Sequence, residues 1–273
     1  MKKSLIVTWI ANNDYPIFRA WLEKYHTWFE EIIICWDLAF RFPFYNAFIQ
    51  QSLSHLNNIK FLDPPPRELG VDDWRNVATN HLVNNSSGDW LVSIEQDWFA
   101  KDWPQLLAKI EAAMQTSDMV GWLNPTNVPY IHPAFWFIKR ELLEKTTRDF
   151  GPHSEISGCD HFGMVTYEAQ QLEAKITPVQ ELGFATEVST PELTDTFHLG
   201  GVNQNYLDFD ELFKAGQVHR SSIFRVYNHW SMLAPVRQSP EFLRKCQEVD
   251  TYLKSLHPEI DPATNGWGQF FNV

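Results

Sequence analysis

The chain has 273 residues and a formal net charge of −12, from 22 lysines and arginines against 34 aspartates and glutamates. This length suits one large domain with a sizeable core, and the charge disfavours nucleic-acid polymers and anionic membranes as partners. The sequence contains no apolar run of about 18 residues, so we expect no transmembrane segment. Its cysteines, Cys35, Cys159 and Cys246, are far apart and lack metal-type spacing. They predict a reducing, cytoplasmic setting without a disulfide framework.

Strand and helix patterns alternate over residues 1–100. Apolar, β-rich runs predict strands at residues 4–10, 31–36, 59–62 and 90–94. Apolar residues at helical spacing predict a helix over residues 18–29, preceded by Pro16, and another over residues 73–84. Residues 40–56 have no clear pattern and are either helical or irregular. This βαβ alternation predicts an α/β fold, in which helices cover both faces of a parallel sheet.

The rest of the chain is less regular. Helices are expected at residues 104–114, from Arg140 onward, and from residues 157–163 to about residue 174, with strands at 119–122, 134–138 and 176–179. A long irregular stretch containing His198 follows. Apolar residues recur at helical spacing over residues 242–256, which is most simply core packing. There is no internal repeat and no clear linker, so we expect residues 1–273 to form a single domain.

Two carboxylates follow the strand at residues 90–94. Glu95 and Asp97 are one residue apart, and side chains so spaced on a strand point the same way. If the chain stays extended, both can present oxygens to one ion. Open α/β sheets bind their ligands beyond the carboxyl ends of the strands. The alternative is an ordinary acidic loop.

The segment from Asp73 to Asp97 resembles the nucleotide-sugar half of GT-A glycosyltransferases, particularly the family 2-like enzymes. In that family an Arg-Asn helix, a Gly-Asp turn and an apolar strand lead into a DxD motif; here the motif is Glu95-Gln96-Asp97, an ExD. Other matches occur in the expected order over roughly residues 4–200. They are the first strand with its turn at Ala11 and Asn12, Asp37 after the second strand, Asp160 at the start of a later helix, and His198 before Leu-Gly-Gly.

The resemblance implies a GT-A fold, a Rossmann-like and mostly parallel sheet flanked by helices. Residues 1–100 would form the nucleotide-sugar half, residues 101–200 the acceptor and catalytic half, and residues 201–273 a loop and helix extension. It also implies a divalent cation that stabilises the departing pyrophosphate. Asp97 would bind the cation directly, Glu95 would contact it through water or bind the ribose, and His198 would complete its shell. Carboxylate, imidazole and phosphate ligands suit Mn²⁺ or Mg²⁺.

The resemblance also assigns the donor and the catalytic residues. Ala11, Asn12 and Gln96 would line the donor site, Asp37 would receive the base or ribose, and Arg75 would contact the nucleotide or pyrophosphate. Arg75 is otherwise a surface helix residue. Asp160 resembles the catalytic base, which deprotonates the acceptor hydroxyl in a transfer expected to invert the anomeric centre. Asp160 is otherwise a helix cap, and His161 or Glu155 is then the base.

The function implied is metal-dependent transfer of a sugar from a nucleotide-sugar donor to a carbohydrate or other hydroxyl acceptor. A sugar-phosphate nucleotidyltransferase is the second interpretation, although the turn at residues 10–14 has neither the glycine nor the lysine that such enzymes use there. A non-catalytic sugar-binding module of the same fold is the third. Motifs of P-loop kinases, classical dehydrogenases, zincins and serine hydrolases are absent from the sequence. Trp98, Trp103 and Trp136 near the acidic pair are either core residues or platforms for sugar rings.

Overall fold

The computed structural model describes residues 1–9, 15–36, 50–63, 65, 74–95, 98–100, 102–124, 128–151, 153, 161–184, 186–188 and 196–198. Its strands are β1 (Lys3–Trp9), β2 (Glu31–Trp36), β3 (Ile59–Leu62), β4 (Trp90–Ile94), β5 (Trp98–Ala100), β6 (Met119–Asn124), β7 (Tyr130–Lys139), β8 (Ile176–Pro178), β9 (Thr186–Val188) and β10 (Thr196–His198). Its α-helices are α1 (Tyr15–Tyr25), α3 (Trp74–Asn84), α4 (Trp103–Met114), α5 (Arg140–Leu143) and α6 (Gly163–Gln171), with 3-10 turns η2 (His26–Trp28) and η3 (Val179–Leu182).

Seven strands form the main sheet in the order β3-β2-β1-β4-β7-β6-β8, and β5, β10 and β9 form a small second sheet. Neighbouring strands of the main sheet run parallel except at β7, which is antiparallel to both β4 and β6. A short connection from β6 to β7 explains the exception, because a parallel return needs a crossover of about a dozen residues or more. The predicted α/β class with a mostly parallel sheet is confirmed.

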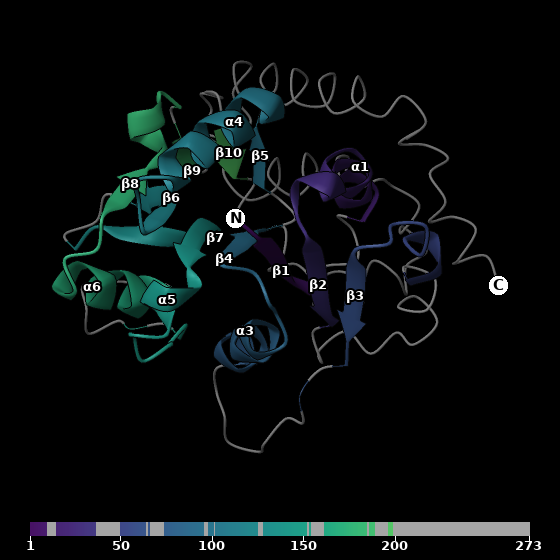
Figure 1. Ribbon diagram of the computed structural model, residues 1–273, viewed down its shortest axis with the longest axis horizontal. Helices are drawn as coiled ribbons and strands as arrows, with labels where there is room; N and C mark the ends of the chain where they lie inside the picture. The colour runs from purple at the N-terminus through teal and green to yellow at the C-terminus, as the bar shows by residue number, and fades with distance from the viewer. Residues whose placement is uncertain are drawn as a thin grey trace, which may run out of the picture.

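Helices cover both faces of the main sheet, α1 and α4 on one side and α3, α5 and α6 on the other (Figure 1). Side chains alternate along each strand, so neighbouring residues enter different cores. Leu5 and Ile32 pack in the core under α1 and α4, whereas Ile6 and Ile33 pack in the core over α3 and α6. Strands buried on both faces explain why the sequence shows continuous apolar runs.

The amino-terminal edge of the sheet is closed by a polar cluster around Glu31. Its Oε1 accepts hydrogen bonds from the Ser4 hydroxyl and from the backbone and hydroxyl of Ser87. Burial raises the pKa of Glu31, but these hydrogen bonds outweigh it and leave the pKa below its ordinary value. Gly88 packs so closely that a Cβ there would lie 2.4 Å from Ser4 Oγ. These hydrogen bonds and the close packing of Gly88 therefore stabilise the amino-terminal edge of the sheet.

The aromatic residues near the acidic pair are core residues, and the interpretation that they stack on sugar rings is wrong. Trp98, Trp103 and Trp136 are 3%, 2% and 3% exposed. Trp98 stacks on Phe135 with ring centroids 3.7 Å apart, and Trp136 stacks on Phe162 at 4.4 Å. These contacts join β5 to β7 on one face and α6 to β7 on the other.

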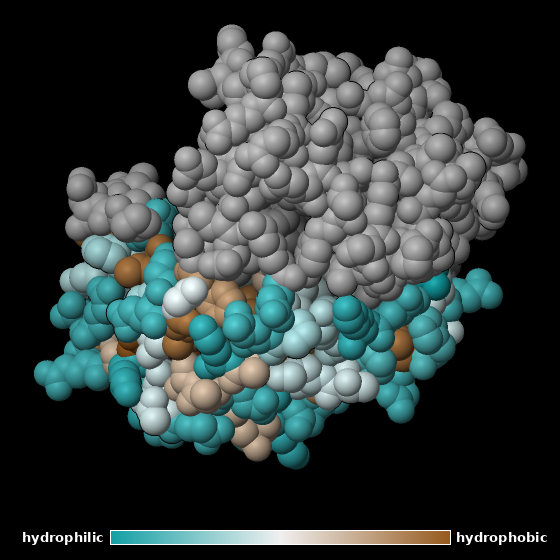
Figure 2. All heavy atoms as spheres, turned by 90° about the horizontal axis from the view of Figure 1, so that it is seen from above, coloured by the Kyte–Doolittle hydropathy of each residue, from teal (hydrophilic) through white to brown (hydrophobic). Residues whose placement is uncertain are grey.

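The described surface is mainly hydrophilic on the side shown in Figure 2, with apolar side chains in small patches. Over the described residues, the large apolar side chains that are exposed are Met1, Tyr167 and Leu172, which are scattered. Among the helices in this part of the chain, none has the length and apolar character needed to cross a bilayer.

Candidate functional site

Four parallel strands end at one edge of the main sheet. β1 lies between β2 and β4, so the chain builds outward through β2 and β3 on one side before it crosses to β4 on the other. This reversal is a topological switch point, and open α/β sheets bind ligands in the crevice outside the carboxyl ends of the strands at such a point. Glu95 is the first residue after β4. It therefore lies at the switch point.

Glu95 is held by backbone hydrogen bonds on both sides. Its N–H donates to the Ala134 carbonyl of β7 at 2.8 Å, and its carbonyl accepts from the Trp98 N–H at 3.0 Å. The second bond joins two residues that are three apart in the sequence. β4 ends at Ile94, and Asp97 lies outside the described residues, so the expectation that Glu95 and Asp97 present oxygens to one ion stays a prediction.

The small sheet brings His198 beside Trp98. β10 pairs antiparallel with β5, and His198 lies opposite Trp98, the residue directly after Asp97. Residues opposite each other in an antiparallel pair have Cα atoms about 4.5–5.5 Å apart. His198 was expected in an irregular stretch, and it instead ends a strand. Its backbone therefore reaches the ExD segment across about a hundred residues of sequence.

The start of α6 is anchored beneath the same region. Phe162 stacks on Trp136, and Trp136 is the β7 partner of Ser93, two residues before Glu95. Phe162 occupies the N-cap position of α6 with φ 73° and no side-chain cap. Asp160 lies two residues before this position and outside the described residues, so its assignment as base or cap stays a prediction.

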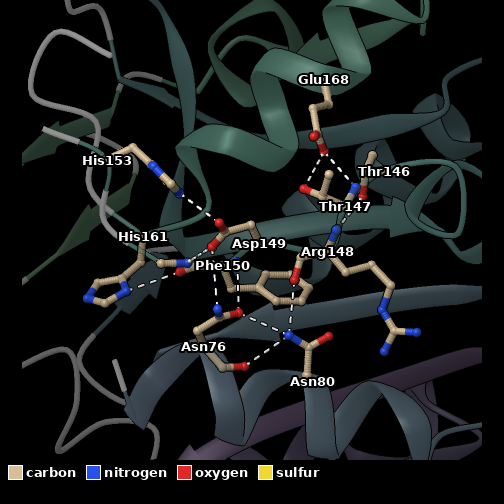
Figure 3. Close-up of polar contacts among 11 residues, drawn as sticks. Asn76, Asn80, Thr146, Thr147, Arg148, Asp149, Phe150, His153, His161 and Glu168 are labelled. Atoms are coloured by element: carbon tan, nitrogen blue, oxygen red, sulfur yellow. Dashed lines mark hydrogen bonds and ion pairs between the residues drawn. The ribbon is translucent and has the colours of Figure 1, made fainter. Parts of the chain in front are cut away.

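A polar network joins α3 to the loop between α5 and α6 (Figure 3). Asn76 Oδ1 accepts from the Phe150 N–H at 3.0 Å and from Asn80 Nδ2 at 2.9 Å. Asn80 Nδ2 also donates to the Arg148 carbonyl at 3.0 Å. His161 Nδ1 holds the Phe150 carbonyl at 3.1 Å, and because a carbonyl only accepts, this nitrogen carries the proton. The loop is thus fixed to the helix that contains Arg75.

Within this network Asp149 is paired with His153. The carboxylate Oδ2 lies 2.9 Å from His153 Nε2, while Oδ1 accepts from the Gly151 N–H at 2.9 Å and from Asn76 Nδ2 at 3.4 Å. Sequence reasoning missed Asn76, Asp149 and His153 as a group. The signal available was the four-residue spacing of Asn76 to Asn80 and of Asp149 to His153, which is common by chance.

The structure reaches only some of the predicted site residues. It describes Glu95 in full and the backbones of Arg75, in the first turn of α3, and His198. The others lie outside the described residues: Ala11, Asn12, Asp37, Gln96, Asp97, Asp160 and Glu155. In the part of the chain that is described, no three histidine, cysteine, aspartate or glutamate side chains gather as a metal site. The metal prediction depends on Asp97 and on the His198 side chain, and it stays a prediction.

No protein-family profile and no curated protein sequence matches this chain. Among solved structures, it is similar to glucosyl-3-phosphoglycerate synthase from Mycobacterium tuberculosis in complex with Mn²⁺, UDP and glucosyl-3-phosphoglycerate, at 13% identity and a TM-score of 0.43, over 67% of this chain and 75% of that one. It is similar to residues 1–349 of S. aureus TarS at 14% identity and a TM-score of 0.43, over 97% and 83% of the two chains.

A third similar structure is 2-C-methyl-D-erythritol 4-phosphate cytidylyltransferase from Thermus thermophilus, at 12% identity and a TM-score of 0.39, over 65% of this chain and 88% of that one. Glycosyl and nucleotidyl transferases are thus both among the similar structures. At these identities and scores the likeness does not extend to particular residues or to an activity.

Proposed function

We propose that this chain is a metal-dependent glycosyltransferase that moves a sugar from a nucleotide-sugar donor to a carbohydrate or other hydroxyl acceptor. One observation carries the proposal: the pairing of β5 with β10 sets His198 opposite the residue after Asp97, at the switch point of the sheet. Residues 1–273 form one catalytic domain in this proposal, with the donor in residues 1–100, the acceptor in residues 101–200 and an extension in residues 201–273.

The residues around the switch point suit a divalent cation. Carboxylates of Asp97 and Glu95 and the imidazole of His198 form the mixed donor set that Mn²⁺ accepts readily and Mg²⁺ accepts less well. When bound, the cation would neutralise charge on the departing pyrophosphate. Glu95 is hydrogen-bonded through both its backbone N–H and its carbonyl, so its backbone is already ordered before a ligand arrives.

The other donor contacts are assigned by position. In the sequence, Ala11 and Asn12 follow the end of β1 and Asp37 follows the end of β2, and both strands end at the same edge as β4. Gln96 directly follows Glu95 in the sequence, and Arg75 is in the first turn of α3. We assign the base or ribose to Asp37 and the pyrophosphate to Arg75, whose guanidinium forms paired hydrogen bonds with phosphate oxygens.

Asp160 is the proposed base, taking the proton of the acceptor hydroxyl as that oxygen attacks the anomeric carbon with inversion. The leaving nucleoside diphosphate takes the electron pair of the bond that breaks. Asp160 precedes His161, which is fixed to the Phe150 carbonyl, and Phe162, which is fixed to Trp136. Anchors on the two residues that follow the proposed base would help to fix its distance to the reacting oxygen.

The test is a screen of UDP-, GDP-, CMP- and dTDP-sugars with Mn²⁺, measuring thermal stabilisation and slow donor hydrolysis. We expect one nucleotide to stabilise the protein and its sugar to be released only with the cation. Glu144→Gln, an exposed carboxylate change after α5, should behave as wild type. Formation of nucleotide sugar from a nucleoside triphosphate and a sugar 1-phosphate would instead support a nucleotidyltransferase. Binding without any turnover would support a sugar-binding module.

A further inference from the structure

The Asp149–His153 pair is a second group of titratable side chains near the proposed site. Asp149 is held by three donors, the Gly151 N–H, Asn76 Nδ2 and His153 Nε2 (Figure 3). The His153 side chain is 22% exposed. Among the described residues, its imidazole has one hydrogen-bond partner, Asp149. The pair is therefore ordered by hydrogen bonds to Asp149 and partly exposed, since the Asp149 side chain is itself 36% exposed.

The pair lies toward the carboxyl edge of the sheet. α3 ends at Asn84, close to the amino edge where β4 begins, and Asn76 lies eight residues earlier, about 12 Å along the helix axis. Phe150, next to Asp149, stacks on Trp136 with ring centroids 6.3 Å apart. Trp136 pairs with Ser93, two residues before Glu95. Both contacts place Asp149 on the side of the sheet where the donor is proposed to bind.

The backbone around the pair adopts an uncommon conformation. Arg148, directly before Asp149, has φ 57°, and Phe162, directly after His161, has φ 73°. Left-handed conformations are uncommon for residues other than glycine, and such strain gathers at functional sites when the surrounding structure holds it in place. Here the loop is held by Asn76, Asn80 and the aromatic stack of Phe150 on Phe162.

The carboxylate decides which imidazole nitrogen is free to bind a ligand. An ionised carboxylate only accepts hydrogen bonds, so His153 Nε2 carries the proton, and in the neutral ring Nδ1 then has the lone pair. The Arg148 guanidinium donates to Asn84 Oδ1 at 2.6 Å, and Glu168 binds the backbone and hydroxyl of Thr147. The pair therefore suits a neutral hydrogen-bond donor better than an anion.

We propose that His153 is a substrate-binding residue of the acceptor half, and that its Nδ1 accepts a hydrogen bond from an uncharged hydroxyl group of a carbohydrate acceptor. The proposal rests on the proposed glycosyltransferase function and adds a substrate class to it: a neutral sugar rather than a phosphorylated one at this position. Asp149 acts through His153 as a positioning residue.

Asp149→Asn tests the pair without removing it. Because the Gly151 N–H holds the oxygen at the Oδ1 position, the new amide turns its NH₂ toward His153 Nε2. The amide then donates, Nε2 must accept, and the proton moves to Nδ1. Nitrogen chemical shifts of ¹⁵N-histidine report this change of tautomer in the protein without substrate. We expect Nε2–H in wild type and Nδ1–H in Asp149→Asn.

Binding is measured with methyl glucoside, methyl galactoside and methyl mannoside as neutral probes, and with glucose 6-phosphate and inorganic phosphate as anionic probes, in protein saturated with UDP and Mn²⁺. We expect at least one neutral sugar to shift the His153 Nδ1 signal. Asp149→Asn and His153→Gln should lower the affinity for that sugar by roughly tenfold, as expected for the loss of one hydrogen bond. His153→Asn places an oxygen near the former Nδ1 and should stay within about threefold.

His55 offers a matched control, because it is also a carboxylate-paired histidine, 3.7 Å from Glu23, but lies before β3 at the amino edge. His55→Gln should change neither sugar binding nor the His153 signals. The inference is overturned if the anionic probes bind at His153 more tightly than the neutral ones, or if donor binds and no neutral sugar shifts His153. A protein that fails to bind any nucleotide would instead overturn the proposed function, while the tautomer measurement would still report on the pair.

Discussion

His132 supports Glu95 through two successive hydrogen bonds, and its removal should alter the position of Glu95 at the switch point. His132 Nδ1 accepts from the Ala134 N–H at 3.1 Å, and the Ala134 carbonyl accepts from the Glu95 N–H at 2.8 Å. The imidazole is buried beside Trp122 with ring centroids 4.2 Å apart. The perturbation is a comparison of His132→Ala with His132→Asn.

The expected loss of folding stability follows from the contacts that each substitution removes and the groups that it leaves without a partner. Ala134 is 0% exposed, so alanine at position 132 leaves a buried N–H without its acceptor, which costs about 1–3 kcal/mol. Loss of the ring against Trp122 adds roughly 1 kcal/mol in both variants. Asparagine hydrogen-bonds readily to the backbone two residues ahead. We therefore expect losses of about 2–4 kcal/mol for His132→Ala and about 1 kcal/mol for His132→Asn.

Urea unfolding measures this difference directly. Donor hydrolysis titrated with Mn²⁺ measures its effect on the site, and half-maximal activity should need more Mn²⁺ in His132→Ala than in His132→Asn. Equal stabilities for the two variants would refute the role given to the Ala134 N–H bond. Different stabilities with identical Mn²⁺ titrations would refute the coupling from Ala134 to Glu95.

Three other changes test separate parts of the account. His198→Ala should raise the Mn²⁺ concentration for half-maximal donor hydrolysis by more than the roughly tenfold typical of losing an outer-shell partner; an unchanged titration returns His198 to a structural role. Asp160→Asn should lower transfer by roughly 10²- to 10⁴-fold with unchanged donor binding and melting temperature, since Phe162 holds the cap position; normal transfer would move the base elsewhere. Glu31→Gln should cost about 1–3 kcal/mol at pH 7. Folding lowers the pKa of Glu31, so its carboxylate stabilises the folded state above the unfolded pKa of about 4.3, and this stabilisation is lost as pH falls through the folded pKa. Urea unfolding should therefore show the stabilities of wild type and Glu31→Gln converging in acid. A difference that stays constant with pH would contradict this.

The main strands could be predicted from sequence because their signal is local. β2, β3 and β4 have the predicted bounds, since each is an apolar run that ends where polar residues begin. β5, β9 and β10 were missed. Each has three residues. β10 pairs with β5, which lies about a hundred residues earlier in the sequence, and with β9, which directly precedes it in chain order. No local pattern distinguishes such strands from irregular chain.

The site was predictable in part for the same reason. The place of Glu95 follows from the end of β4, which the sequence marks clearly. The backbone hydrogen bonds of Glu95 to Ala134 and Trp98 are tertiary contacts with β7 and β5, and the left-handed Phe162 depends on its stack with Trp136. A bulky residue with positive φ has no sequence signature. α6 begins after Phe162, whose stack on Trp136 is a tertiary contact that cap propensity does not predict.

The central claim is that Asp97 and His198 hold a divalent cation on which nucleotide binding depends. Calorimetric titration of UDP into the protein, with and without Mn²⁺, tests it most directly, using wild type, Asp97→Asn and the exposed control Glu144→Gln. We predict that Mn²⁺ strengthens UDP binding to wild type and to Glu144→Gln by at least tenfold, and leaves binding to Asp97→Asn unchanged. Equal UDP affinity with and without Mn²⁺ in wild type, or an undiminished Mn²⁺ effect in Asp97→Asn, would contradict the claim.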